Sequence, residues 1–414
     1  MSSHFFLLEG AITQERLSWI EETLKFFFVR LNPENLLHHA ETPEGVFCFL
    51  LTGDALYSLH EPETIRIWEI ILSLPSVRII CDRQELDLRG ISVENLKMKY
   101  QDQVIDHNRL GVNGRLSFWN DVAKIARQHE QPIPSTIGYL QTGSPYMHQS
   151  SLSAVRCLTA ALDIHASVEL YAYLDGIHLG HTGQHPVECE NIGEELEAIA
   201  EKAAKKGLQC QMLACRRCAT ARGYSTWDDG KGQVISACTI RPFRIRTMDE
   251  IVDRFERNHL ILGENAASIQ LKKEGTQGSF SFQDNSRSPP VTILITHTPY
   301  GTEMASGALT FAVGCAAQGI LTRVIFIEDG VYALAGRHVV EGDVSFFNLQ
   351  ELIDVIAGSD TLHFFAFQPS LHQRGLTKNP KLNAVLDIGT QELGQLFFYP
   401  PHDVQAGHQR ILFF

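Results

Sequence analysis

The stretch from Val291 to Leu334, VTILITHTPYGTEMASGALTFAVGCAAQGILTRVIFIEDGVYAL, decides the fold. A short apolar run, 291–295, leads into a Pro-Tyr-Gly turn, and an Ala/Gly-rich amphipathic segment then continues to Gln318. A second apolar run, 322–327, ends in an Asp-Gly pair. This order predicts a strand, a helix and a second, parallel strand, which is the βαβ unit of α/β proteins.

The same order of features occurs three times along the chain. The stretch 137–179 repeats the strand, the Pro-Tyr turn, the helix, the second strand and the Asp-Gly pair. Residues 4–59 repeat it more loosely, with Ala55 in place of the glycine. We therefore predict an α/β protein with three repeated modules, 1–130, 135–272 and 290–414, each a mostly parallel sheet with helices on both faces. The Pro-containing segment 130–135 and the Gly/Ser-rich segment 273–290 are the predicted linkers.

Each module also carries an Arg-Gly pair behind a later strand, at Arg89, Arg222 and Arg374. In each case the strand is predicted to enter a helix of about two turns that the glycine closes. In the middle module this junction is the segment CQMLACRRCATARGY, from Cys210 to Tyr224. The junction places a cysteine pair at the start of the short helix, which is where we expect the chemistry.

The composition and charge bear on whether the protein binds nucleic acid or membranes and on where it is found. The chain has 414 residues, 44% of them hydrophobic, which is enough for several cores. Its formal net charge of −13 argues against general attraction to nucleic acid or to an anionic membrane. We find neither a signal-peptide pattern nor an apolar run long enough for a membrane span. Nine scattered cysteines, several within apolar runs, suit a reducing compartment, so we predict a cytoplasmic protein.

The pattern resembles the DsrE/DsrF/DsrH family, which includes the TusBCD sulfur-relay complex. Three markers carry the resemblance. They are the Pro-Tyr-Gly-Thr turn before an Ala-rich helix, the Asp-Gly-Val after the second strand, and a cysteine eight residues before the glycine of Arg-Gly. In the middle module that spacing runs from Cys215 to Gly223. The likeness is strongest in 291–334 and 215–223, and weakest in residues 1–120.

The resemblance implies a sulfur carrier. In such families a cysteine accepts a persulfide from one protein and passes it to another, and by position that residue is Cys215. The implied partners are sulfur-donor and sulfur-acceptor proteins, with no cofactor. Related complexes pair two trimers, which suggests a homodimer of pseudo-trimers. The other two modules depart from the pattern, because Phe367 and Asp82 stand at the equivalent positions and Cys81 is one residue out of register.

Independently of the family resemblance, the residues around Cys215 favour a reactive thiol. A helix start and cationic neighbours, here Arg216, Arg217 and Arg222, favour the thiolate form. Cys218 lies one turn further on the same face, where it is placed to resolve a persulfide or to form a disulfide.

Several alternatives stay open. Cys210, Cys215, Cys218 and Cys238 could together bind zinc or an iron–sulfur cluster, although they lack the spacing of a second CxxC knuckle. The CxxC motif could instead serve a thiol–disulfide redox protein. The two thiols could also be unreactive, with the protein acting as a scaffold that binds sulfur-relay partners.

Two further residues are assigned a supporting role. Asp175 follows the second strand of the middle module, at the edge of the sheet where α/β sites form. Its counterparts Asp54 and Asp329 recur in modules without the cysteine, which favours a structural role. His178 stands where the other modules have a tyrosine, and it puts a titratable group near the site. His178, His181 and His185 could bind a metal ion, but solvated loop histidines are commoner, and we predict no metal site.

Overall fold

A computed structural model describes most of the chain. The described residues are 3–31, 46–74, 76–106, 117–128, 136–228, 230, 232–236, 238–239, 242–255, 260–271, 289–339, 348–399 and 408–414. The predicted linker 130–135 lies outside these residues, as does 273–288 of the second linker.

The elements follow one another in three similar series. The first contains β1 (Ser3–Leu8), α1 (Gln14–Leu31), β2 (Val46–Leu51), α2 (Pro62–Ser73), β3 (Val77–Cys81), α3 (Arg83–Arg89), α4 (Glu94–Lys99), β4 (Val104–Asp106) and α5 (Ser117–Gln128). The second contains β5 (Thr136–Gln141), α6 (Ser150–Asp163), β6 (Ser167–Ala172), α7 (Ile192–Lys205), β7 (Cys210–Cys215), α8 (Arg216–Ala221), β8 (Ser225–Asp228), β9 (Gly232–Ile235), β10 (Phe243–Arg246), α9 (Met248–Val252) and β11 (Leu260–Gly263). After β12 (Asn265–Gln270), the third contains β13 (Val291–Ile295), α10 (Met304–Ala317), β14 (Thr322–Phe326), α11 (Leu349–Ile356), β15 (Leu362–Phe367), α12 (Gln368–Gln373), β16 (Val385–Ile388), α13 (Thr390–Phe398) and β17 (His408–Phe413).

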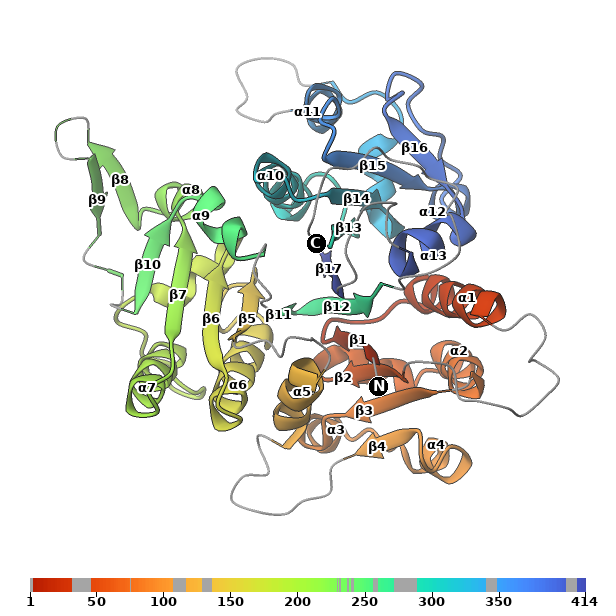
Figure 1. Ribbon diagram of the computed structural model, residues 1–414, viewed down its shortest axis with the longest axis horizontal. Helices are drawn as coiled ribbons and strands as arrows, with labels where there is room; N and C mark the ends of the chain where they lie inside the picture. The colour runs from red at the N-terminus through yellow and green to blue at the C-terminus, as the bar shows by residue number, and fades with distance from the viewer. Residues whose placement is uncertain are drawn as a thin grey trace.

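The strands form a ten-stranded sheet, a five-stranded sheet and a two-stranded hairpin (Figure 1). The larger sheet has the order β16-β15-β14-β13-β17-β12-β1-β2-β3-β4, and the smaller has the order β10-β7-β6-β5-β11. Strands of the smaller sheet pair in parallel. In the larger sheet only the two pairs made by β12 are antiparallel. The predicted class, α/β with mostly parallel sheets, is confirmed.

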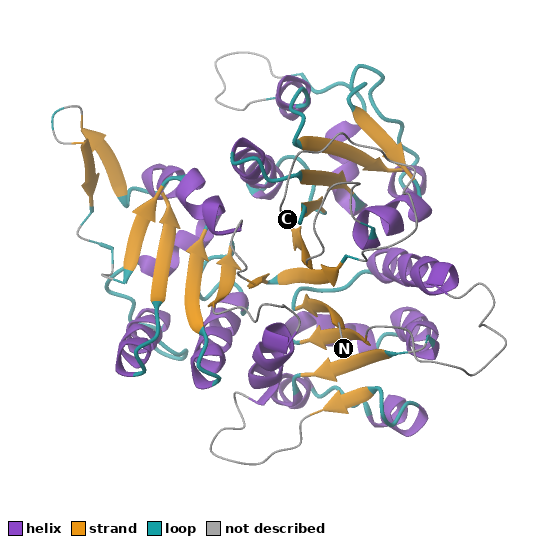
Figure 2. Cartoon of the chain, in the orientation of Figure 1, coloured by secondary structure: helices purple, strands orange, loops and turns teal. Residues whose placement is uncertain are grey.

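Helices cover both faces of the sheets, which is why the central strands are buried along their whole length (Figure 2). Every residue of β5, β13 and β14 is buried. The Ala/Gly-rich composition of α10 permits close packing, since a Cβ atom added at Gly314 would lie 2.6 Å from Met248 of the neighbouring α9. Among the described residues, no helix is long and apolar enough to cross a membrane.

Strand β12 joins the first and third series into one sheet. In the other two series the last strand pairs in parallel with the first, as β11 does with β5 and β17 with β13. Beside β1 that place is taken by β12, which runs antiparallel and follows the second series in sequence. The predicted second module, 135–272, therefore contains a strand that belongs to the other sheet. An unpaired β1 edge would leave backbone groups exposed, and β12 satisfies them.

The repeated Asp-Gly pair has a steric cause. At Gly330 an added Cβ atom would lie 1.8 Å from the carbonyl oxygen of Ile295, and at Gly176 it would lie 2.0 Å from that of Gln141. The 3₁₀ helix after the second strand therefore packs directly on the end of the first strand. This contact brings the preceding aspartate to the edge of the sheet.

Candidate active site

Cys215 lies where β7 ends and α8 begins. It is the N-cap residue of α8, with extended backbone angles (φ −62°, ψ 122°), and its side chain is only 2% exposed. The backbone N–H groups of Arg217 and Cys218, at the start of α8, help to lower the pKa of its thiol, although neither forms a capping hydrogen bond to the side chain. Asp82 is the N-cap residue at the equivalent position of the first series, and its carboxylate accepts hydrogen bonds from the N–H groups of Gln84 and Glu85. The N-cap position thus favours a negatively charged side chain.

The pKa values of the Cys215 and Cys218 thiols are shifted in opposite directions. A hydrogen bond from the Cys218 thiol is the largest of the causes that set the pKa of Cys215, which is lowered to about 7. Burial opposes this lowering, while the two backbone N–H groups and the charge of Arg217 support it. The pKa of Cys218 is raised, because its proton is held by Cys215 and its side chain is buried. Cys215 therefore loses its proton first and is about half thiolate at pH 7, while Cys218 stays protonated.

The three arginines near Cys215 make different contacts. Arg217 supports the thiolate, and its Nη1 donates to Thr310 Oγ1 at 3.1 Å. Arg222, expected to support Cys215, forms ion pairs with Asp175 at 2.7 Å and Glu303 at 2.5 Å, and its charge acts on the pKa of Cys218. Arg216 is exposed.

Asp175 and His178 lie beside Arg222. Asp175 pairs with that arginine, and its Oδ1 is 4.0 Å from His178 Nε2. His178 Nδ1 is hydrogen-bonded to the Tyr224 hydroxyl at 2.8 Å, and burial lowers the pKa of the histidine. Both residues therefore hold the loop and the end of α8 together.

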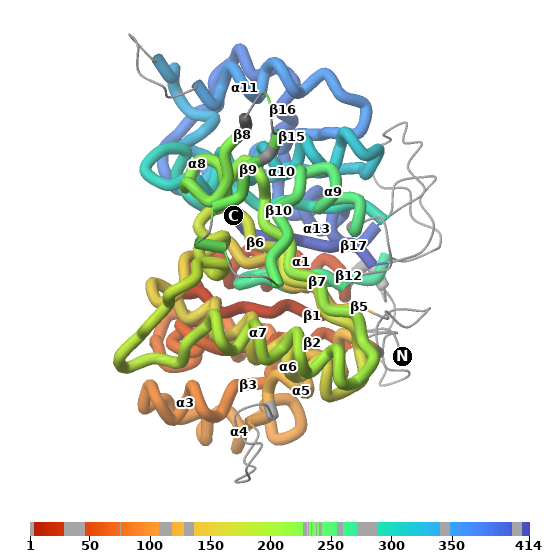
Figure 3. Tube along the Cα trace, turned by 90° about the vertical axis from the view of Figure 1, so that its left-hand side faces the viewer, coloured from red at the N-terminus to blue at the C-terminus, as the bar shows by residue number. Residues whose placement is uncertain are grey.

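The third series completes the cysteine site, a feature that local sequence spacing did not predict. Helix α10 lies beside α9 (Figures 1 and 3), and its Thr310 accepts the hydrogen bond from Arg217 of α8. Tyr173, next to the two cysteines, donates its hydroxyl to the carbonyl oxygen of Gly307 in α10 at 2.8 Å. Gly307 is needed there, because an added Cβ atom would lie 2.8 Å from Leu174. A series that has Phe367 in place of the junction cysteine thus forms one wall of the site.

The same contact recurs around a ring of three interfaces. Each Arg-Gly arginine pairs with the Asp of its own series and also reaches the start of the first helix in the next. Arg89 contacts Asp54 and Gln149, Arg222 contacts Asp175 and Glu303, and Arg374 contacts Asp329 and Glu15. Because Glu15 belongs to the first series, the order closes on itself. Asp54, Asp175 and Asp329 therefore act at the interfaces.

At the positions equivalent to the cysteines, the other two junctions hold different side chains. The first has Asp82 and Glu85, and Glu85 pairs with Arg156 of α6 at 3.1 Å. The third has Phe367 and Ser370, and Ser370 donates to Glu15 at 2.6 Å. Cys81 is fully buried next to the first junction, and burial raises its pKa.

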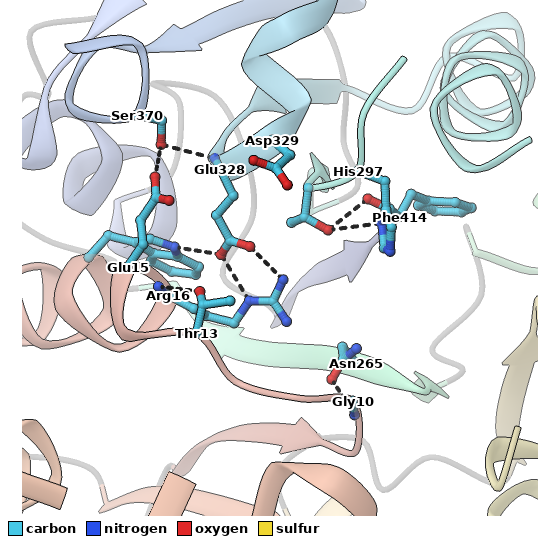
Figure 4. A network of polar contacts seen from close by, with 12 residues as sticks. Gly10, Thr13, Glu15, Arg16, Asn265, His297, Glu328, Asp329, Ser370 and Phe414 are labelled. Atoms are coloured by element: carbon cyan, nitrogen blue, oxygen red, sulfur yellow. Dashed lines mark hydrogen bonds and ion pairs between the residues drawn. The ribbon is translucent and has the colours of Figure 1, made fainter. Parts of the chain in front are cut away.

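A cavity of about 1260 Å³ lies where the three series meet. Cys218 lines it, whereas Cys215 does not. Its wall between the third and first series is a polar network in which Glu328 accepts two hydrogen bonds from Arg16, at 2.9 and 2.7 Å, and one from Trp19 Nε1 at 3.1 Å (Figure 4).

Within the described parts of the chain, no three His, Cys, Asp or Glu side chains are grouped so that they could hold a metal ion. Of the four cysteines considered for zinc, Cys238 is exposed and Cys210 is half-buried at the start of β7, while Cys215 and Cys218 are buried at its end.

Comparisons with known proteins agree with the repeats. The sequence model of the family described as DsrE/DsrF-like matches residues 135–257 and 290–397, which is more than half of the chain. Residues 1–130 lie outside both ranges, so a third copy of this family stays a prediction.

An uncharacterized protein of Methanopyrus kandleri is 34% identical over 85 residues, and the match covers 20% of this chain and 65% of that protein. The crystal structure of the E. coli YchN protein matches with 22% identity and a TM-score of 0.25, over 30% of this chain and 99% of that one.

Proposed function

The chain belongs to the DsrE/DsrF-like family, and on that premise we propose that it carries sulfane sulfur as a persulfide on Cys215. Membership of the family implies a role related to sulfur relay. The observation that supports the finer proposal is the place of Cys215 at the N-cap of α8, one of three equivalent junctions, where Cys218 and two backbone N–H groups help to lower its pKa to about 7. A sulfur-donor protein, a sulfur-acceptor protein and the pairing of two chains stay predictions.

The proposed reaction uses these groups directly. The Cys215 thiolate attacks the outer sulfur of a donor persulfide, the S–S bond of the donor breaks, and the donor leaves as a thiolate. The new persulfide on Cys215 carries negative charge on its outer sulfur. Cys218 and Arg217 are close enough to stabilise that charge by a hydrogen bond and by electrostatic attraction. Delivery to an acceptor thiolate is the same exchange in reverse.

A redox role is the second candidate, and one observation favours it. Cys215 and Cys218 are both buried at the start of α8, three residues apart, and the Cys218 side chain is the largest cause acting on the pKa of Cys215, so the two thiols are neighbours that an oxidant could join. The redox reading predicts a reversible disulfide that forms without any sulfur donor. A pure scaffold predicts that Cys215 reacts no faster than an ordinary thiol at mildly acidic pH.

Intact-mass spectrometry after incubation with a persulfide donor tests the proposal. Cys189 and Cys238 are exposed and would add background, so both are first replaced by serine. We expect one adduct with the mass of one sulfur atom, and Cys215→Ser should abolish it while Cys48→Ser, a buried cysteine of β2, should not. The persulfide proposal fails if no such adduct forms or if Cys215→Ser retains it.

A further inference from the structure

One position of α10, in the third series, contacts the cysteine junction of the second. Thr310 and Arg156 hold the same place in the first helices of their series, seven residues after the side chain that contacts the Arg-Gly arginine. Arg156 reaches Glu85 of α3 at 3.1 Å, and Thr310 reaches Arg217 of α8 at 3.1 Å. At both interfaces this position therefore contacts the short helix of the preceding junction.

The two contacts differ in charge. Arg156 compensates the carboxylate of Glu85, whereas Thr310 is neutral and leaves the guanidinium of Arg217 with its full charge. No carboxylate among the described residues pairs with Arg217, and Glu303 at the start of α10 pairs with a different arginine. At the thiol junction a cation is therefore held in place without being neutralised.

The hydroxyl of Thr310 is oriented for this contact. It donates to the carbonyl oxygen of Ser306 at 2.9 Å, which leaves its lone pairs for Arg217 Nη1. Arg217 is exposed, so without this acceptor its long side chain would gain rotamer freedom. A half-buried threonine of another series thus holds the guanidinium on the cavity wall that also contains Cys218.

The neighbouring charges make Arg217 the arginine that acts on the thiolate. Besides it, the charged or titratable side chains near the cysteine pair come from α8, β10 and the end of β6, namely Arg216, Arg222, Arg246, Cys218 and Tyr173. Arg222 and Arg246 pair with carboxylates, the second with Glu250 at 3.8 Å. Cys218 has the largest effect on the pKa of Cys215, and the arginine whose charge lowers it further is Arg217.

We propose that Thr310 is a positioning residue for Cys215, because it holds Arg217 beside the cysteine pair as an uncompensated cation. The third series then sets the reactivity of a thiol that the second series carries. The consequence for sulfur transfer rests on the proposed persulfide of Cys215, whose negatively charged outer sulfur the same guanidinium attracts.

A double-mutant cycle, followed as a pH profile, tests this role. The alkylation rate of Cys215 is measured from pH 5 to pH 10 at low ionic strength, with Cys189 and Cys238 replaced by serine. Arg217→Gln should raise the midpoint by roughly 0.3–0.7 pH units, as expected for a partly screened charge, and Thr310→Val should produce most of that shift. In the Arg217→Gln background, Thr310→Val should have no further effect, because it acts through the guanidinium.

Conservative and control variants separate positioning from packing, with thermal unfolding to show that each is folded. Thr310→Ser keeps the hydroxyl and should keep the wild-type midpoint. Thr310→Glu would compensate the guanidinium and should raise the midpoint at least as far as Arg217→Gln does. Val313→Ala, on the exposed part of α10 one turn further, should change nothing. An unchanged midpoint in Thr310→Val, or the same shift with and without Arg217, overturns the inference.

Loading with sulfur from a persulfide donor keeps the two proposals apart. If the wild type takes up no sulfur, the carrier proposal fails, and the cycle still decides whether Thr310 positions Arg217. If it takes up sulfur while the cycle shows no coupling between the two residues, the inference is wrong and the persulfide carrier stands.

Discussion

Replacement of Cys218 by alanine should raise the pKa of Cys215 and thereby change the pH dependence of its reactivity. The thiol of Cys218 is the largest cause acting on this pKa, which is about 7 against an ordinary value of 9.0. Burial acts in the opposite direction, so without Cys218 we expect a value near 9 or above. At pH 7 the thiolate fraction of Cys215 would then fall from about one half to about 1%.

The rate of alkylation should fall by less than the thiolate fraction does. A thiolate of higher pKa is a better nucleophile, by roughly 8-fold for two pKa units at a Brønsted coefficient of about 0.45. At pH 7 the variant should therefore react with iodoacetamide ~6-fold more slowly than the wild type, and at pH 10 it should react several-fold faster. The two pH profiles should cross between these values.

Measurement of the alkylation rate from pH 5 to pH 10, with Cys189 and Cys238 replaced by serine, gives both profiles. Cys218→Ser is the matched control, because its hydroxyl can still donate to Cys215 and should keep the midpoint well below 9. A midpoint that stays near 7 in Cys218→Ala refutes the reasoning, since the backbone N–H groups and Arg217 would then suffice. Thermal unfolding of Cys218→Ala must show that the variant is folded, because an unfolded chain would also present a cysteine of ordinary pKa.

Three further predictions concern the interfaces and the sheet edge. Glu9 lies buried, with hydrogen bonds from Ser153 and Tyr139, and burial raises its pKa from 4.5 to about 8. The stability that its protonation contributes is complete below pH 4.5 and is lost as the pH rises through 8. By denaturant unfolding, Glu9→Gln should therefore be nearly neutral at pH 4.5 and more stable than the wild type by roughly 4 kcal/mol at pH 8, and equal effects at both pH values would contradict this. Arg16→Met should cost ~3–5 kcal/mol in the free energy of unfolding by leaving Glu328 buried without its partner, and Arg16→Met with Glu328→Gln should recover most of that loss. Gly176→Ala should cost at least ~2 kcal/mol because of the Gln141 carbonyl, whereas Gly358→Ala, with open space around it, should stay within ~0.5 kcal/mol of the wild type in the same measurement.

The local part of the site could be predicted from the sequence because it depends on short spacings. An apolar strand followed by Cys-Arg-Arg-Cys and a closing Arg-Gly predicts a helix start with two thiols on one face, and Cys215 and Cys218 lie there. The predicted resemblance to the DsrE/DsrF/DsrH family is confirmed by the family match. These markers of the family could be recognised in the sequence because each is a turn or a helix cap formed within about ten residues.

Contacts between the series could not be predicted in the same way. Arg222 was expected to act on Cys215 because it is seven residues away, but its ion pair with Glu303 is made across 81 positions. The antiparallel place of β12 and the contact of Tyr173 with Gly307 likewise depend on how distant segments pack. One signal was present: a carboxylate or amide, Glu15, Gln149 or Glu303, stands at the start of each first helix.

Fusion of three series into one chain allows each interface to differ. An assembly of three identical chains would repeat every interface residue three times, whereas here one interface holds Cys215 and Cys218, another holds Asp82 and Glu85, and the third holds Phe367 and Ser370. Glu85 and Ser370 bond to Arg156 and Glu15 of the next series, so they stabilise the ring. Under the persulfide proposal the ring therefore carries one sulfane sulfur per chain. Of the three junctions around the cavity, the one with Cys215 and Cys218 is then the reactive one.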